Sequence, residues 1–269
     1  MNAITLSPVT PVRPIAPYIG GKRNLARRLC ALIEATPHTT YAEAFVGMGG
    51  VFFRRQSRPK CELINDWSGD VANLFRCMRA HPGALVDLVA LQLHSRAEFD
   101  RAVREDPTTL TDLQRAARFV YLQKTAFGGK VNGRHFGVSL GRPARFQAST
   151  VGDDLLAAAK RLEGVTIEQL GWSEFMARYD RPDVLFYLDP PYFGCEDDYG
   201  DGMFGRQEFG AMAEQLAVLK GRFILSLNDR PQVREIFARF QVETVGTHYG
   251  LAGQGALPAS EVIITGGGA

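Results

Sequence analysis

Several features that classify proteins quickly are missing from this sequence. Its 269 residues contain only four cysteines (Cys30, Cys61, Cys77 and Cys195), which form no Cys-x-x-Cys pair and have no accompanying histidine cluster. This spacing argues against a zinc site or a disulfide framework, so we expect reduced thiols and no metal. No stretch approaches the roughly 20 apolar residues of a membrane helix, and the N-terminus lacks a basic-then-apolar export pattern. We therefore expect a cytoplasmic protein without a membrane partner.

Acidic residues are missing from one long window. No Asp or Glu lies between Asp112 and Asp153, whereas lysine and arginine contribute seven formal positive charges there. The chain as a whole carries a net charge of only +2, so this local imbalance, interleaved with aromatic residues, is what indicates a nucleic-acid partner. A solvated basic face is the alternative interpretation of such a window.

What is present is a strand with an unusual end. The apolar run Val184–Leu188 leads into Asp189-Pro190-Pro191-Tyr192, which predicts a buried strand with a rigid polar tip. A residue that precedes a proline is held in an extended conformation, and a proline donates no backbone hydrogen bond. The tip therefore offers a carboxylate, a fixed carbonyl and an aromatic face, which suit a planar base with an exocyclic amine. A strand-ending turn without chemistry is the alternative.

A second motif lies near the N-terminus. Tyr18 and a Gly-Gly-Lys turn that ends in Lys22 precede a helix predicted over residues 23–35. Such a turn can present backbone N–H groups and an ammonium to an anion, for example a carboxylate. The alternative is an ordinary helix start with a solvated lysine.

A third motif indicates a nucleotide-like ligand. A strand predicted at residues 41–46 runs through Phe45 into a turn with Gly47 and Gly49, followed by a predicted helix. Glycine allows a ligand to approach the backbone closely. The next predicted strand ends at Asp66, at the distance along the chain where an acid binds ribose hydroxyls in Rossmann-like sites. A helix N-cap is the alternative role for Asp66.

The order of elements predicts an α/β fold. Strands alternate with helices before and after the basic window, which predicts a mostly parallel sheet closed by an antiparallel C-terminal hairpin at residues 242–249 and 261–265. We expect residues 1–78 and 151–269 to form the core and residues 79–150 to form an inserted, largely helical domain. All three motifs then fall at the carboxyl edge of one sheet, where ligands bind.

In order and content, these motifs resemble those of the Dam-type DNA adenine methyltransferases (class I, D12 group), across residues 15–265. The resemblance implies a Rossmann-like fold with a target-recognition insertion that binds double-stranded DNA. It also implies methyl transfer from S-adenosyl-L-methionine to N6 of a flipped-out adenine, with S-adenosyl-L-homocysteine as product and no metal. We expect the protein to be bacterial or phage-encoded, to be a monomer, and to belong to a restriction-modification system.

The resemblance also implies roles for individual residues. Asp189 and the Pro190 carbonyl would accept hydrogen bonds from the N6 amine, and Tyr192 would stack on the base. The cofactor would be bound by Tyr18, Lys22, Phe45, Gly47, Gly49, Asp66 and Asp189. The DNA would be contacted by Lys124, Lys130, Asn132, Arg134 and His135.

One position departs from the family pattern. Gly171-Trp172 stands where relatives often carry Asp-Phe, so a backbone group or stacking by Trp172 would have to hold the cofactor's adenine. This departure leaves open a non-catalytic DNA-binding regulator with a degenerate cofactor pocket. A cytosine-N4 or RNA-adenine methyltransferase is the alternative on the same scaffold, whereas no residue suggests the hydride transfer of a nicotinamide-linked dehydrogenase.

Overall fold

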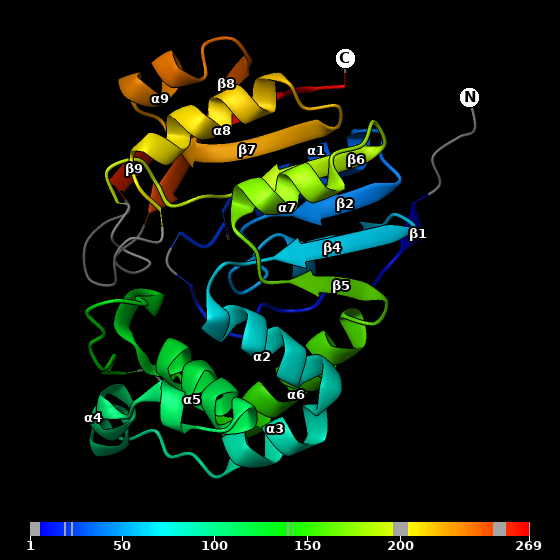
Figure 1. The fold of residues 1–269 in the computed structure, drawn as a ribbon. Coiled ribbons are helices and arrows are strands. Elements are labelled where there is room, and N and C mark those ends of the chain that lie inside the picture. Colours follow the sequence, from blue (N-terminus) through cyan, green and yellow to red (C-terminus); the bar gives the residue numbers. More distant parts are fainter. Residues whose placement is uncertain are drawn as a thin grey trace.

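A mostly parallel sheet forms the centre of the molecule (Figure 1). The computed structural model describes residues 6–18, 20–22, 24–138, 140–141, 143–195, 204–249 and 257–268. The strand order is β5-β4-β2-β6-β7-β9-β8. The parallel strands are β2 (Thr40–Glu43), β4 (Cys61–Asn65), β5 (Val165–Glu168), β6 (Val184–Leu188) and β7 (Arg222–Asn228). Strand β9 (Leu257–Gly267) pairs antiparallel with β7 and with β8 (Gln241–Tyr249), which confirms the predicted fold class.

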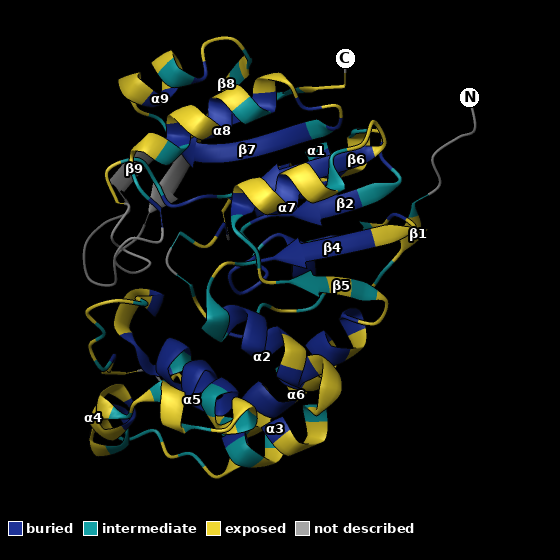
Figure 2. Ribbon diagram, viewed as in Figure 1, coloured by how far each residue is buried: buried dark blue, intermediate teal, exposed yellow. Residues whose placement is uncertain are grey.

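Helices cover both faces of this sheet, and the inner strands are apolar for that reason. On β6, Leu185 and Tyr187 face the layer that contains α1 (Ala26–Ala35), whereas Phe186 and Leu188 face the opposite layer. The opposite layer consists of α7 (Trp172–Tyr179), α8 (Gln207–Ala217) and α9 (Pro231–Ile236). Figure 2 shows the resulting burial of β2, β6 and β7. The inner strands are therefore buried on both faces.

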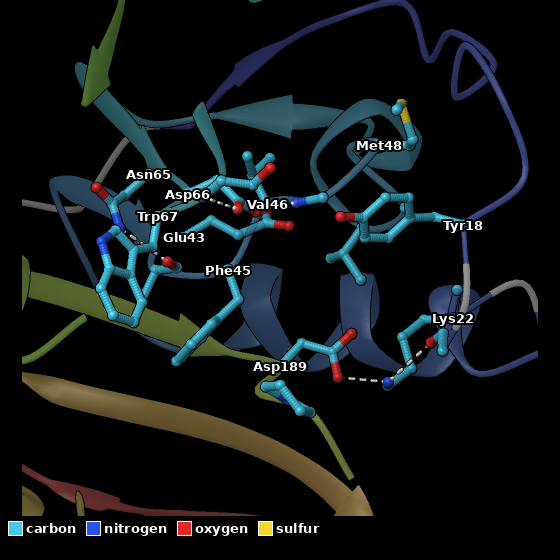
Figure 3. A pocket seen from close by; sticks show the side chains of 18 of the residues that line it. Tyr18, Lys22, Glu43, Phe45, Val46, Met48, Asn65, Asp66, Trp67 and Asp189 are labelled. Carbon is cyan, nitrogen blue, oxygen red and sulfur yellow. Dashed lines mark hydrogen bonds and ion pairs between the residues drawn. The ribbon is translucent and has the colours of Figure 1, made fainter. Parts of the chain in front are cut away.

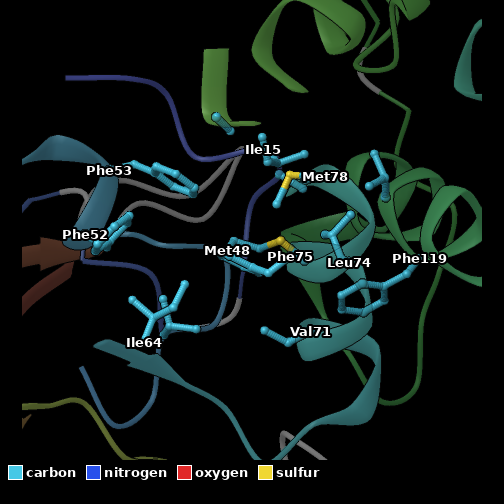
Figure 4. Packing of buried hydrophobic residues seen from close by; sticks show 14 of the residues in the cluster. Ile15, Met48, Phe52, Phe53, Ile64, Val71, Leu74, Phe75, Met78 and Phe119 are labelled. Atoms are coloured by element: carbon cyan, nitrogen blue, oxygen red, sulfur yellow. The ribbon is translucent and has the colours of Figure 1, made fainter. Parts of the chain in front are cut away.

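A helical region leaves the sheet after β4 and returns at β5, the neighbouring strand. Its helices are α2 (Gly69–Ala80), α3 (Pro82–Ala90), α4 (Arg96–Arg104), α5 (Asp112–Thr125) and α6 (Ala148–Arg161). Helix α5 begins with a capping box between Thr111 and Gln114. Val71 and Phe75 of α2 lie between Ile64 of β4 and Phe119 of α5 (Figure 4), so the core is continuous from the sheet into the helices.

The predicted insertion at residues 79–150 stays a prediction. Helices α2 and α6 lie largely outside it, yet α2 packs against α5 and α6 packs against α3. These two helices connect the sheet to the remaining helices of the region.

Several local predictions were wrong. The helix predicted after the glycine turn is only the short 3-10 helix η1 (Phe52–Arg54). It ends there because the next residue, the buried Arg55, has an extended backbone conformation and pairs with Glu62 of β4. The apolar pattern of residues 233–240 predicts a helix, but α9 ends at Ile236, where a turn leads the chain into β8. The elements that were not predicted are α4, the 3-10 helices η2 (Pro107–Thr109) and η3 (Phe127–Gly129), and the short antiparallel pair β1 (Ser7–Pro8) and β3 (Ser57–Arg58). Of the helices that the structure describes, none is long and apolar enough to cross a membrane.

Candidate active site

A cavity lies beyond the carboxyl ends of β4, β2 and β6, three neighbouring strands (Figure 3). Each strand brings one carboxylate to it: Asp66 follows β4, Glu43 ends β2 and Asp189 follows β6. Tyr18 and Lys22 reach the same cavity from the segment before α1. The sheet thus brings together residues that are far apart in the sequence.

Gly47 and Asp66 are joined directly. The N–H of Gly47 donates to Asp66 Oδ2 at 2.8 Å, and the N–H of Ser68 donates to Asp66 Oδ1 at 2.9 Å. Burial raises the pKa of Asp66 to about 6, and these two hydrogen bonds oppose the shift. Ser68 is the N-cap residue of α2, so Asp66 is not the helix cap.

The ring of Tyr18 closes over Gly47. Gly47 has a φ of +49°, and a Cβ added there would lie 3.0 Å from the Tyr18 ring. This position therefore requires glycine both for its backbone conformation and for the close approach of the ring. Burial, together with the nearby Asp66, raises the pKa of the Tyr18 phenol well above its usual value, so it remains protonated.

Lys22 connects the N-terminal segment to the Asp-Pro-Pro-Tyr motif. Its buried ammonium forms an ion pair with Asp189 Oδ1 and donates to the carbonyl of Gly20 at 3.1 Å. The same ammonium lies 4.6 Å from the centroid of the Tyr192 ring, within range of a cation–π contact. Lys22 therefore touches both groups that were predicted to receive the target base.

Asp189 is half-buried at the end of β6. Burial raises its pKa to about 6, while Lys22 and a hydrogen bond from Ser226 Oγ at 3.3 Å lower it and Glu261 raises it. Pro191 lines the cavity, whereas Pro190 is buried beside it and Tyr192 is half-buried against Lys22.

Phe45 and Gly49 differ in position although they flank the same turn. Phe45 lines the cavity and packs edge-on against Phe204, with ring centroids 5.9 Å apart. Gly49 is absent from the described lining of the cavity, and a Cβ there would overlap the ring of Phe53 in the core. The structure therefore places Gly49 on the core side of the turn.

Glu43, Trp67 and Asn65 are among the cavity residues that were not predicted from the sequence. Glu43 is buried and accepts a hydrogen bond from the Tyr41 hydroxyl at 2.6 Å; burial raises its pKa to about 8, opposed by Tyr41 and Arg55. Trp67 is 52% exposed at the cavity. Asn65 donates to the carbonyls of Ala44 and Leu170, and so ties two edges of the cavity together. Glu43 carried a readable signal, since it is an acidic residue within an otherwise apolar predicted strand just before the glycine turn.

The departure at Gly171 leaves a space. Gly171 is the N-cap residue of α7, and no heavy atom lies within 4 Å of where its Cβ would be. Trp172 lines the cavity, but its indole N–H donates to Glu208 at 2.8 Å. Trp172 therefore offers the cavity a ring surface.

Some basic residues of the acid-free window lie next to acidic residues from other parts of the chain. Lys124 is largely buried 3.6 Å from Asp154, and Arg134 donates to the Gln123 side chain at 3.1 Å. Arg115 likewise pairs with Asp70. The exposed predicted DNA contacts are Lys130, Asn132 and His135. Of the basic residues in this window, Arg142 lies outside the described part of the chain.

Comparisons with known proteins found a family model and several curated relatives that match this chain. The family model of the D12 class N6 adenine-specific DNA methyltransferases matches residues 18–251. Type II methyltransferase M1.LlaDCHI of Lactococcus lactis subsp. cremoris is 26% identical over 255 residues, 87% of each chain. Type II methyltransferase M.CviBI of Paramecium bursaria Chlorella virus NC1A is 22% identical over 84% of this chain and 86% of its own. Type II methyltransferase M.MjaIII of Methanocaldococcus jannaschii is 27% identical over 67% of this chain and 69% of its own.

Proposed function

Because the chain belongs to the D12 class of N6 adenine-specific DNA methyltransferases, we propose that it methylates N6 of an adenine flipped out of double-stranded DNA, with Asp189 at the reacting nitrogen. The chain is a DNA adenine methyltransferase by family. The single observation that carries the residue assignment is that Asp189 lines the same cavity as Gly47 and Asp66. One cavity can then hold the cofactor at β2 and β4 and receive the base at β6.

The residues of the cavity fit S-adenosylmethionine. Asp66 retains acceptor capacity for ribose hydroxyls beside its two backbone contacts. Tyr18, Phe45 and Trp67 offer apolar surfaces, and Glu43 offers a side-chain carboxyl group. Among the described residues no cluster of His, Cys, Asp or Glu could hold a metal ion. When bound, the cofactor supplies a methyl group on a positively charged sulfur, so that the leaving group is a neutral thioether.

Asp189 acts on the target amine. The N6 lone pair is delocalised into the adenine ring, so acceptors that hold both N–H bonds favour a pyramidal nitrogen and stabilise its developing positive charge. Asp189 and the Pro190 carbonyl are the proposed acceptors. As N6 bonds to the methyl carbon, the carbon–sulfur electron pair leaves with sulfur, and one N6 proton can pass to the Asp189 carboxylate.

Lys22 has to move before the base can bind. Its ammonium occupies an acceptor oxygen of Asp189 and one face of Tyr192, the two groups assigned to the target. The carboxylate of the cofactor is the proposed partner for the displaced ammonium. Binding of the cofactor would thereby prepare Asp189 for the amine.

The DNA would lie across the helical region. We assign DNA contacts to the exposed Lys130, Asn132 and His135, whereas Lys124 and Arg134 support the fold of this region through their partners. A glycine-bounded turn of this kind can approach a groove closely. Residues 79–150 remain the proposed target-recognition domain, and a monomer is the proposed active form.

Methyl transfer from labelled cofactor to duplex DNA tests the proposal. Asp189→Ala should lower kcat by about a hundredfold or more, because charge stabilisation at the reacting atom is lost, while calorimetry should show nearly unchanged cofactor binding. Near-normal turnover in this variant would refute the role of Asp189. Sequencing of modified DNA identifies the base: N4-methylcytosine would support the alternative substrate. No cofactor binding at millimolar concentration would support the non-catalytic regulator.

A further inference from the structure

Strand β7 places a buried hydroxyl beside the reacting carboxylate. Strands β6 and β7 are parallel, with Leu188 opposite Leu225, so Ser226 lies next to Asp189. Ser226 is completely buried, and its Oγ lies 3.3 Å from Asp189 Oδ1 and 3.0 Å from the Tyr187 hydroxyl. Tyr187 is also completely buried, two residues before Asp189 on the same face of β6. The three side chains form a continuous chain of hydrogen bonds.

The direction of this chain follows from its members. An ionised carboxylate only accepts, so Ser226 must donate its single proton to Asp189. Tyr187 must then donate to Ser226, and it is able to do so because burial and the nearby Asp189 raise the pKa of Tyr187 well above its usual value. Each hydroxyl therefore has one defined role while Asp189 is charged.

We propose that Ser226 is a positioning residue for the methyl transfer, which holds one oxygen of Asp189 so that the other faces the target amine, and that Tyr187 fixes the orientation of the Ser226 hydroxyl. The inference rests on the proposed function of Asp189. Both Ser226 and Lys22 contact Oδ1, and Figure 3 shows the second oxygen turned away from Lys22 toward the cavity.

Ser226 matters most once Lys22 has been displaced. The charged and titratable groups around Asp189 are Lys22 from the N-terminal segment, Glu43 from β2, Tyr187 from β6 and Glu261 from β9. Of these, Glu261 disfavours a charged Asp189. When the ammonium of Lys22 moves to the cofactor, the neutral donor Ser226 remains in place and continues to favour the ionised, oriented carboxylate.

The same strand also fixes the other end of the motif. Asn228 follows Ser226 by two residues, so both side chains point to one face of β7. Its side chain accepts from the Phe193 N–H at 3.0 Å and donates to the Phe193 carbonyl at 2.9 Å. Strand β7 thus holds the motif before and after Tyr192, which is what an alignment-dependent reaction requires.

The test compares Ser226→Ala, Ser226→Thr and Tyr187→Phe with the wild type. Ser226→Ala should lower kcat about tenfold and shift the acidic limb of its pH profile upward by about one unit, because a donor to a charged group is lost. Cofactor binding should not change. Tyr187→Phe should shift the limb in the same direction but less, and Ser226→Thr, which retains the hydroxyl, should restore the wild-type profile. Tyr179→Phe is the matched control, since its hydroxyl bonds to Glu168 away from the cavity.

An unchanged pH profile in both Ser226→Ala and Tyr187→Phe would overturn the inference, whatever happens to kcat. Tyr187→Phe also provides the test if Ser226→Ala fails to fold. Titration of the Asp189 carboxyl by carbon NMR gives a readout that needs no turnover: its pKa should rise in Ser226→Ala, and an unchanged value would contradict the contact. An inactive wild type with the expected NMR shift would instead refute the proposed function and leave the hydrogen-bond chain supported.

Discussion

Three glycines with the same backbone conformation should respond differently to alanine. Gly47, Gly49 and Gly164 have φ values of +49°, +72° and +77°. A Cβ would lie 3.0 Å from the Tyr18 ring at Gly47 and would overlap the buried Phe53 ring at Gly49. At Gly164 it would meet no heavy atom within 4 Å. Gly164→Ala therefore isolates backbone strain, Gly47→Ala adds a contact at the cavity and Gly49→Ala adds a clash in the core.

The expected magnitudes separate stability from binding. Left-handed strain alone should reduce the free energy of unfolding by about 1–2 kcal/mol in Gly164→Ala. Gly47→Ala should lose a similar amount, because the added Cβ meets the edge of a side-chain ring, which can shift, and not backbone. Gly49→Ala should lose about 1–3 kcal/mol more, as is usual for an overpacked core. The Kd for S-adenosylmethionine should rise about tenfold or more in Gly47→Ala, since the displaced ring narrows the cavity, and should not change in Gly164→Ala.

Urea unfolding and calorimetry measure the two quantities on the same samples. If Gly47→Ala binds the cofactor as well as Gly164→Ala does, the contact between Tyr18 and Gly47 does not shape the cofactor site. If Gly49→Ala is no less stable than Gly164→Ala, the assignment of Gly49 to the core side of the turn is refuted.

Three further predictions concern the cofactor's adenine, pH and DNA. Gly171→Asp should strengthen cofactor binding about three- to tenfold, since there is room for the side chain and a hydrogen bond to the cofactor's adenine contributes about 1 kcal/mol. Calorimetry would compare this variant with Gly171→Ala as the control. Equal affinities would show that the adenine lies elsewhere. The folded-state pKa of Glu43 is raised from 4.5 to about 8, so the folded state binds the extra proton and loses stability as pH rises through 8, by about 1.4 kcal/mol between pH 7 and pH 9. In urea unfolding, Glu43→Gln should remove this slope, and a persisting slope would contradict the assignment. Lys130→Ala should weaken DNA binding and reduce the slope of its salt dependence by about 1, as measured in salt titrations. Lys124→Ala, which loses the ion pair with Asp154, should mainly lower the melting temperature. The reverse pattern would contradict the assignment of Lys130 to the DNA-binding surface.

The fold and the convergence of the site were predictable from local patterns. Alternating apolar strands and helices predict a parallel sheet, and the carboxyl ends of such strands meet at one edge. This reasoning is sufficient to bring Gly47, Asp66 and Asp189 together. Applied once more, it would have found Glu43, which also ends a strand at that edge.

What sequence patterns could not supply were contacts between distant residues. Lys22 was expected at the cofactor, yet in the structure it pairs with Asp189, far along the chain. The basic window contains no acid in sequence, but Asp154 and Asp70 from outside it neutralise Lys124 and Arg115. The place of Gly49 likewise depends on where the Phe53 ring packs. Each of these outcomes depends on tertiary packing.

The connection between β4 and β5 has a consequence for how new target sequences could arise. The chain leaves the sheet after β4 and returns at its immediate neighbour β5. Helix α2 packs against β5 and against α6 at this edge of the sheet. Changes to the chain between His81, where α2 ends and α3 begins, and the start of α6 therefore leave the order of the strands unaltered, provided that contacts such as that of Gln123 with the Pro17 carbonyl are kept. Because residues 79–150 are the proposed target-recognition domain, we expect recombination between relatives at these two junctions to change which DNA sequence is methylated.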